Sequence, residues 1–221
     1  MKNIKDIIDR SEGESTREQE KILRAAWMVS LLAPLSTGIA QYLGRTTVLL
    51  ADFLRRSNEF LALLLAWFVF IKVCQAEQEG EEDKANKLER ISSSFMSLVM
   101  LISGGVVFYS AISQLLSPEP PGWLIPGMLI NGGGLLVNGY FWYKNYQLSK
   151  KNDTVLMANQ WRFYRAKTLM DLVVLTSLLI INFQLLGELS WLSDPVGSII
   201  VAGFMWFSAS RIYFVSKNHS S

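Results

Sequence analysis

Six long apolar segments, separated by short polar ones, constrain this chain more than any other feature. Each is about the 20 residues that an α-helix needs to cross the hydrocarbon core of a bilayer. A soluble bundle accommodates one or two helices this apolar, but not six in succession. The pattern therefore predicts an all-α, multi-pass protein of a cell membrane, a bundle of six transmembrane helices surrounded by lipid. The segments are residues 25–43, 47–73, 91–116, 123–143, 166–186 and 195–215.

The polar ends divide the chain into three parts. Residues 1–24 are a polar leader, residues 25–215 the transmembrane domain, and residues 216–221 a short tail. The leader alternates acids with bases and has no apolar centre, which distinguishes it from a secretory signal peptide. We expect both the leader and the tail to lie in the cytoplasm.

The basic residues indicate this orientation. Most of the 21 Lys and Arg fall in the leader, in the second-to-third and fourth-to-fifth connections, and in the tail. The connections 117–122 and 187–193 contain none. Because positively charged loops stay in the cytoplasm, both termini are predicted to be cytoplasmic, which agrees with an even number of spans.

Composition excludes several other classes of protein. A net charge of +2 is too small for a dedicated nucleic-acid binder. The single cysteine, Cys74, forms no intrachain disulfide, and the single histidine, His219, forms no multi-histidine metal cluster. No span contains a Ser–His pair, and the glycines at 132–134 follow no strand, as a phosphate-binding loop would. We therefore expect neither an enzyme nor a cofactor.

Charged residues interrupt the second and fifth apolar segments. Four uncompensated charges on one transmembrane helix would cost on the order of 10 kcal/mol, so they must face other helices, water or one another. Each base stands four residues from an acid, which places the two on one helix face. They then either neutralise each other and fix helix packing, or form a functional polar site between the second and fifth helices. The pairs are Asp52 with Arg56, Arg55 with Glu59, and Lys167 with Asp171.

Several short motifs, in order along nearly the whole chain, resemble the cation diffusion facilitator family, whose members are six-helix transporters that exchange zinc or related divalent metals for protons. Each motif has only a few residues, and the resemblance rests on their order and spacing. The motifs are Leu49-Leu50-Ala51-Asp52, Glu89, Leu136-Val137-Asn138, the spacing that ends at Asp171, and Asp194-Pro195.

The resemblance implies a transport site and a homodimer. The family's site has a pair of His or Asp residues four apart on the second helix and a similar pair on the fifth. The matching positions here are Arg55 with Glu59 and Lys167 with Asp171. Neither Arg nor protonated Lys has a lone pair to donate, so these four residues predict no tetrahedral zinc site.

Two further departures from the family concern the polar segments. Members commonly carry a metal-sensing domain after the sixth helix, where this chain has only residues 216–221. No His-rich loop is present, and the acidic segment 77–83 takes its place. That segment either binds hard cations weakly or is a solvated loop.

Three functions remain open for the modified site. In the first, proton-linked cation transport, Glu59 and Asp171 bind a cation or a proton. The positive charge of Arg55 or Lys167 competes with the transported cation for these acids, and Lys167 is a candidate proton-exchanging group. The alternative is a transport-inactive relative that scaffolds or regulates a partner membrane protein. The third is transport of an anion or a small organic ion attracted by Arg55 and Arg56.

Overall fold

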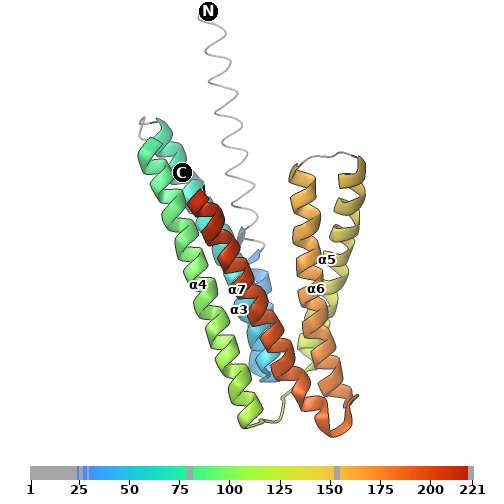
Figure 1. The fold of residues 1–221 in the computed structure, drawn as a ribbon. Helices are drawn as coiled ribbons and strands as arrows, with labels where there is room; N and C mark the ends of the chain where they lie inside the picture. Colours follow the sequence, from blue (N-terminus) through green and yellow to red (C-terminus); the bar gives the residue numbers. More distant parts are fainter. Residues whose placement is uncertain (1–23, 25–26, 29, 79–81, 152–154, 219–221) are drawn as a thin grey trace, which may run out of the picture. The chain divides into compact units, whose positions relative to one another are not determined.

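The computed structural model describes residue 24 and residues 27–28, 30–78, 82–151 and 155–218, which form six α-helices and one 3-10 helix (Figure 1). This confirms the predicted all-α fold. The predicted leader lies outside the described residues apart from residue 24, as do residues 79–81 of the acidic segment 77–83 and residues 219–221. The elements are α2 (Leu32–Gly44), α3 (Thr47–Gln78), α4 (Glu82–Leu116), α5 (Ile125–Lys151), α6 (Val155–Phe183), η1 (Gly187–Leu192) and α7 (Ser193–Asn218).

Most of the helices are longer than the apolar segments that predicted them. α4 begins at Glu82 and α6 at Val155, before the apolar segments that start at residues 91 and 166. The added turns are rich in Glu, Lys, Arg and Gln, which are good helix formers although they are polar. Hydropathy therefore locates the part of a helix that suits lipid, whereas helix propensity carries the helix beyond it.

Within the part of the chain that the structure describes, three helices are long and apolar enough to cross a membrane by length and composition. They contain the stretches Ile91–Leu116, Tyr164–Phe183 and Gly187–Ile212. α3 is also long, with 32 residues, but Asp52, Arg55, Arg56 and Glu59 fall close together within it. Because charges inside an apolar helix need partners, α3 is the first place to look for function.

The chain divides into two compact units. The first consists of Met1–Pro34, Arg56–Met100 and Ser208–Ser221. In it the ring of Trp27 packs against the rings of Phe60 and Trp67, with centroids 6.3 and 5.6 Å apart. These aromatic contacts join the start of the described chain to α3.

The second unit consists of Leu35–Arg55 and Leu101–Phe207 and contains the buried apolar cluster. Leu49, Val107, Leu178 and Val201, from four different helices, are completely buried in this cluster. α5 and α6 lie side by side within the unit (Figure 1).

The second unit has an apolar exterior and a partly polar interior. Leu129 and Leu136 on α5 are 72% and 75% exposed, whereas Asp52 and Asp171 are completely buried. In a soluble protein, buried charges would strongly destabilise the fold, and exposed leucines would add no stability. The distribution suits a helix bundle whose outer surface contacts lipid.

A tight connection positions the beginning of α3. Arg45 follows α2 with φ of 50°, the left-handed conformation that commonly ends a helix, and its N–H donates to the carbonyl of Gln41 at 2.9 Å. The N–H groups of Gly122 and Trp123 donate to the carbonyls of Gly44 and Leu43 at 2.8 and 2.9 Å. The last carbonyls of α2 are thus satisfied, and α3 starts at a defined point.

Candidate transport site

The site is built on one turn of α3 in the second unit. Asp52 and Arg55 are three residues apart and therefore share a helix face. The Nη2 atom of Arg55 lies 2.7 Å from Oδ1 of Asp52. Arg55 is 4% exposed, so this ion pair is removed from solvent within the unit.

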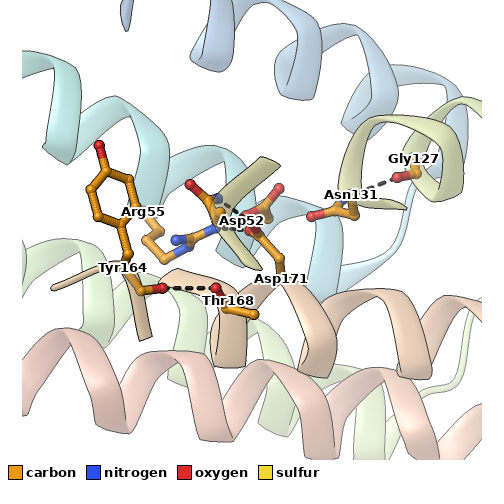
Figure 2. A network of polar contacts seen from close by, with 8 residues as sticks. Asp52, Arg55, Gly127, Asn131, Tyr164, Thr168 and Asp171 are labelled. Carbon is orange, nitrogen blue, oxygen red and sulfur yellow. Dashed lines mark hydrogen bonds and ion pairs between the residues drawn. The ribbon is translucent and has the colours of Figure 1, made fainter. Parts of the chain in front are cut away.

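Asp171 on α6 joins the same guanidinium from a second helix. Its Oδ1 atom is also 2.7 Å from Nη2 of Arg55, so one nitrogen bridges two carboxylates from different helices (Figure 2). The amide nitrogen of Asn138 on α5 donates to the other oxygen of Asp171, Oδ2, at 2.7 Å. Three helices thus meet at Asp171, and both of its oxygens accept hydrogen bonds.

This arrangement makes the guanidinium a cation fixed within the protein. A positively charged group that contacts two carboxylate oxygens at 2.7 Å makes short, charge-assisted hydrogen bonds. Arg is always protonated in proteins, so Arg55 cannot be neutralised and can leave the acids only by rotating away. The resident charge of the site is therefore permanent.

The energetics favour an intact network. Buried charges lose their hydration, and mutual attraction with good geometry is what offsets this loss. Removing one partner of such a buried pair typically costs about 3–5 kcal/mol, because the other charge stays behind uncompensated. The network therefore ties α3 to α6 only as long as both acids and Arg55 remain charged.

The helix surfaces around the network allow close approach. A Cβ at Gly127 on α5 would lie 2.7 Å from a methyl group of Leu49 on α3, so only glycine fits there without repacking. One turn later the buried side chain of Asn131 donates to the carbonyl of Gly127 at 3.0 Å (Figure 2). α5 and α3 are thereby held close enough for Asn138 and Arg55 to share Asp171.

The structure brings together part of the predicted site. Arg55 and Asp171 meet, and Asp52, predicted to support the site by pairing with Arg56, is a direct partner of Arg55. Lys167 lies one helical turn before Asp171 on α6 and is half-buried. Arg56 and Glu59 continue α3 within the first unit. Participation of Lys167, Arg56 and Glu59 in the site stays a prediction, as do the pairings at a spacing of four.

Sequence reasoning did not assign Asn138 to the site. The sequence nevertheless indicated that Asn138 needs a polar partner, because an unsatisfied amide inside an apolar segment is costly in a membrane. The spacing of three between Asp52 and Arg55 was equally visible and is as compatible with a helical ion pair as a spacing of four. Only the packing of α5 and α6 against α3 reveals which partners are used.

A second buried acid in the same unit has a different environment. The two oxygens of Asp194, in the first turn of α7, accept hydrogen bonds from the backbone N–H groups of Thr47 and Val48 at 2.9 and 2.7 Å. The hydroxyl of Ser198 lies 2.8 Å from the hydroxyl of Thr47. Asp194 thus caps α3 from another helix by satisfying N–H groups that have no partner within α3.

The donor set does not form a multidentate metal centre. Within the part of the chain that the structure describes, no three His, Cys, Asp or Glu side chains converge as a metal site. Asp52 and Asp171 supply carboxylates and Asn138 an amide, and a guanidinium lies between the acids. The incompatibility of Arg55 and Lys167 with a tetrahedral zinc site stays a prediction.

Comparison with known families agrees with the architecture. The model of the cation efflux transmembrane domain matches residues 22–216. No curated protein matches the chain. The matched range includes every helix that contributes to the network of Asp52, Arg55, Asn138 and Asp171.

Proposed function

The chain belongs to the cation efflux family of multi-pass membrane transporters, which are not enzymes, and from this premise we propose that it performs proton-linked cation transport through its modified site. The proposed site consists of Arg55, Glu59, Lys167 and Asp171, with Asp52 and Arg56 in support. One observation supports it above the others. A single guanidinium nitrogen bridges carboxylates of two helices, completely buried, in a bundle whose exterior is apolar.

The proposed chemistry follows from the hydrogen bonds of Asp171. A proton on this carboxylate would remove the charge that holds Arg55 and would compete with the hydrogen bond from Asn138. Losing one of its two acids frees the guanidinium to turn toward Asp52 alone. Proton binding would thus loosen the tie between α3 and α6, which is the coupling that an exchanger needs.

The setting of the site completes the proposal. The distribution of Lys and Arg favours a cell membrane, with both termini in the cytoplasm. A homodimer is expected from the family resemblance. In this orientation the beginning of α3 faces the outside, and the acids of the site lie between there and the cytoplasmic end.

Ion-driven proton flux into liposomes tests the proposal. Asp171→Asn and Glu59→Gln remove one charge each and should each reduce flux at least tenfold. Glu188→Gln is the matched control, because Glu188 is an exposed acid on η1 outside the site. If both site variants retain the flux of the unmodified protein, the proposal is wrong.

A second candidate is a transport-inactive scaffold or regulator of a partner membrane protein. It is favoured by the fact that Asp52 and Asp171 both form ion pairs with Arg55 inside the protein. Exchanging the charges, with Arg55→Asp and Asp171→Arg, should preserve folding in this case, and the unmodified protein should move none of H⁺, Na⁺, K⁺, Mg²⁺, Mn²⁺ or Zn²⁺. Measurable flux that the exchange abolishes would exclude the scaffold.

A further inference from the structure

The space between the two buried acids is already occupied by a charge. Nη2 of Arg55 is 2.7 Å from Oδ1 of Asp52 and 2.7 Å from Oδ1 of Asp171. An ion held by both oxygens would have to take the place of that nitrogen. The two acids are completely buried and Arg55 is 4% exposed.

Electrostatics then distinguishes cations by their charge. Coulomb repulsion scales with the product of the charges, so a divalent ion near the acids is repelled by Arg55 twice as strongly as a monovalent ion at the same distance. Arg55 cannot lose its proton to relieve this repulsion. Lys167, one turn from Asp171 on α6, adds to the effect when it is protonated.

The hydrogen bonds at the site also distinguish monovalent from divalent ions. Asn138 donates an amide hydrogen to Oδ2 of Asp171, which uses one of that oxygen's lone pairs. A divalent ion needs several oxygen ligands to replace its tightly held water. A proton needs one carboxylate oxygen, and larger monovalent ions give up their water more easily.

We propose that Arg55 determines the ionic selectivity of the site: its guanidinium, fixed between Asp52 and Asp171, admits a monovalent cation and excludes divalent ions. This inference rests on the proposed function, because it names the class of ion that the same site exchanges. H⁺, Na⁺ and K⁺ share the required single charge, and the flux measurements below distinguish them. Arg55 acts here as a built-in monovalent cation.

Equilibrium binding tests the role of Arg55 without requiring transport. Isothermal titration calorimetry with Mn²⁺ is performed on the purified full chain, on Arg55→Gln and on Arg55→Lys, each with and without Asp171→Asn. Arg55→Gln should bind Mn²⁺ at least tenfold more tightly than the unmodified protein, and the added Asp171→Asn should remove this gain. Arg55→Lys keeps the charge and should show no gain, nor should Arg162→Gln, which removes an exposed charge on α6 outside the site.

Two binding results would overturn the proposal. One is Mn²⁺ binding to the unmodified protein that depends on Asp171 and is as tight as in Arg55→Gln. The other is an equal gain in Arg55→Gln and Arg55→Lys, which would make the side chain's shape the determinant instead of its charge.

Liposome flux on the unmodified protein is the second measurement and remains decisive if Arg55→Gln does not fold. H⁺, Na⁺ or K⁺ should support a flux that Asp171→Asn abolishes, and Mn²⁺ or Zn²⁺ should not. An Asp171-dependent flux of either divalent ion overturns the inference. Absence of every flux, combined with the calorimetric gain in Arg55→Gln, would defeat the proposed function while the role of Arg55 stands.

Discussion

Two buried aspartates of the second unit, Asp171 and Asp194, differ in the groups that donate hydrogen bonds to their carboxylates. Asp171 accepts hydrogen bonds from the side chains of Arg55 and Asn138. Asp194 accepts two from the backbone N–H groups of Thr47 and Val48, with the Thr47 hydroxyl as an additional donor. Side-chain donors can rotate away, but backbone donors move only if the helix itself moves. The difference separates an acid suited to ion exchange from one suited to holding two helices together.

The surroundings of Asp194 strengthen this contrast. The hydroxyl of Ser198 contacts both the carbonyl oxygen of Asp194 and the hydroxyl of Thr47, at 2.8 Å each. A Cβ at Gly197 would collide with the hydroxyl of Ser177, so α6 and α7 are in close contact there. We therefore expect substitutions at Asp194 to affect stability and those at Asp171 to affect both stability and transport.

The largest expected effect comes from Asp171→Ala. It leaves Arg55 buried with one acid instead of two, and should lower the free energy of unfolding by about 3 kcal/mol and abolish cation flux. Unfolding in mixed detergent micelles and liposome flux measure the two quantities. Asp171→Asn is the control for shape: it should lose less stability but equally lack flux. Transport by either variant at half the normal rate would contradict the assignment of Asp171.

The next effect is expected for Asp194→Ala. Loss of the cap leaves the N–H groups of Thr47 and Val48 unsatisfied and should cost about 2 kcal/mol of unfolding free energy. Flux per folded molecule should remain. Because Ser and Asn are also good caps, Asp194→Asn should recover part of the stability. If Asp194→Ala folds normally but transports nothing, the contrast between the two acids fails.

Asn138→Ala is expected to be milder. It removes a hydrogen bond to a charged carboxylate, for which we expect a loss of about 1.5 kcal/mol in unfolding free energy. Flux per folded molecule should persist at a reduced rate, because Asn138 no longer positions the carboxylate of Asp171. Asn145→Ala is the matched control on the same helix, since Asn145 is partly exposed and donates to the carbonyl of Phe141. Equal flux and equal stability in Asn138→Ala and Asn145→Ala would remove Asn138 from the site.

The smallest effect concerns the packing beside Asp194. In Gly197→Ala, overpacking against Ser177 costs about 2 kcal/mol, and better helix propensity returns about 1, which leaves a net loss of about 1 kcal/mol. Adding Ser177→Ala removes the hydroxyl and should recover part of the stability, since Val48 still lies 3.1 Å from the added Cβ. Gly203→Ala on the same helix meets nothing within 4 Å and should be neutral or stabilising. Equal behaviour of Gly197→Ala and Gly203→Ala would show that α6 and α7 are not tightly packed here.

Much of the fold was predictable, because hydropathy and helix propensity act locally along the chain. The apolar segments correspond to the helices, and the match to the cation efflux transmembrane domain confirms the family that short motifs such as Asp194-Pro195 indicated. The first turns of α4 and α6 were missed, because polar helix formers extend these helices before the part suited to lipid. Arg55 and Asp171 could be selected because any charge in an apolar helix demands a partner.

The sequence by itself determined which residues need a partner, because the cost of a charge or an amide in the membrane depends on the residue and its position in a span. It could not determine the partner. Spacings of three and four are both close on a helix, and the rotation of α6 and α5 about their own axes decides which of their residues reach α3. That rotation comes from packing at places such as Gly127 against Leu49. Tertiary structure thus placed Arg55 between Asp52 and Asp171 and brought Asn138 to the carboxylate of Asp171. It also placed the carboxylate of Asp194 against the backbone N–H groups at the start of α3.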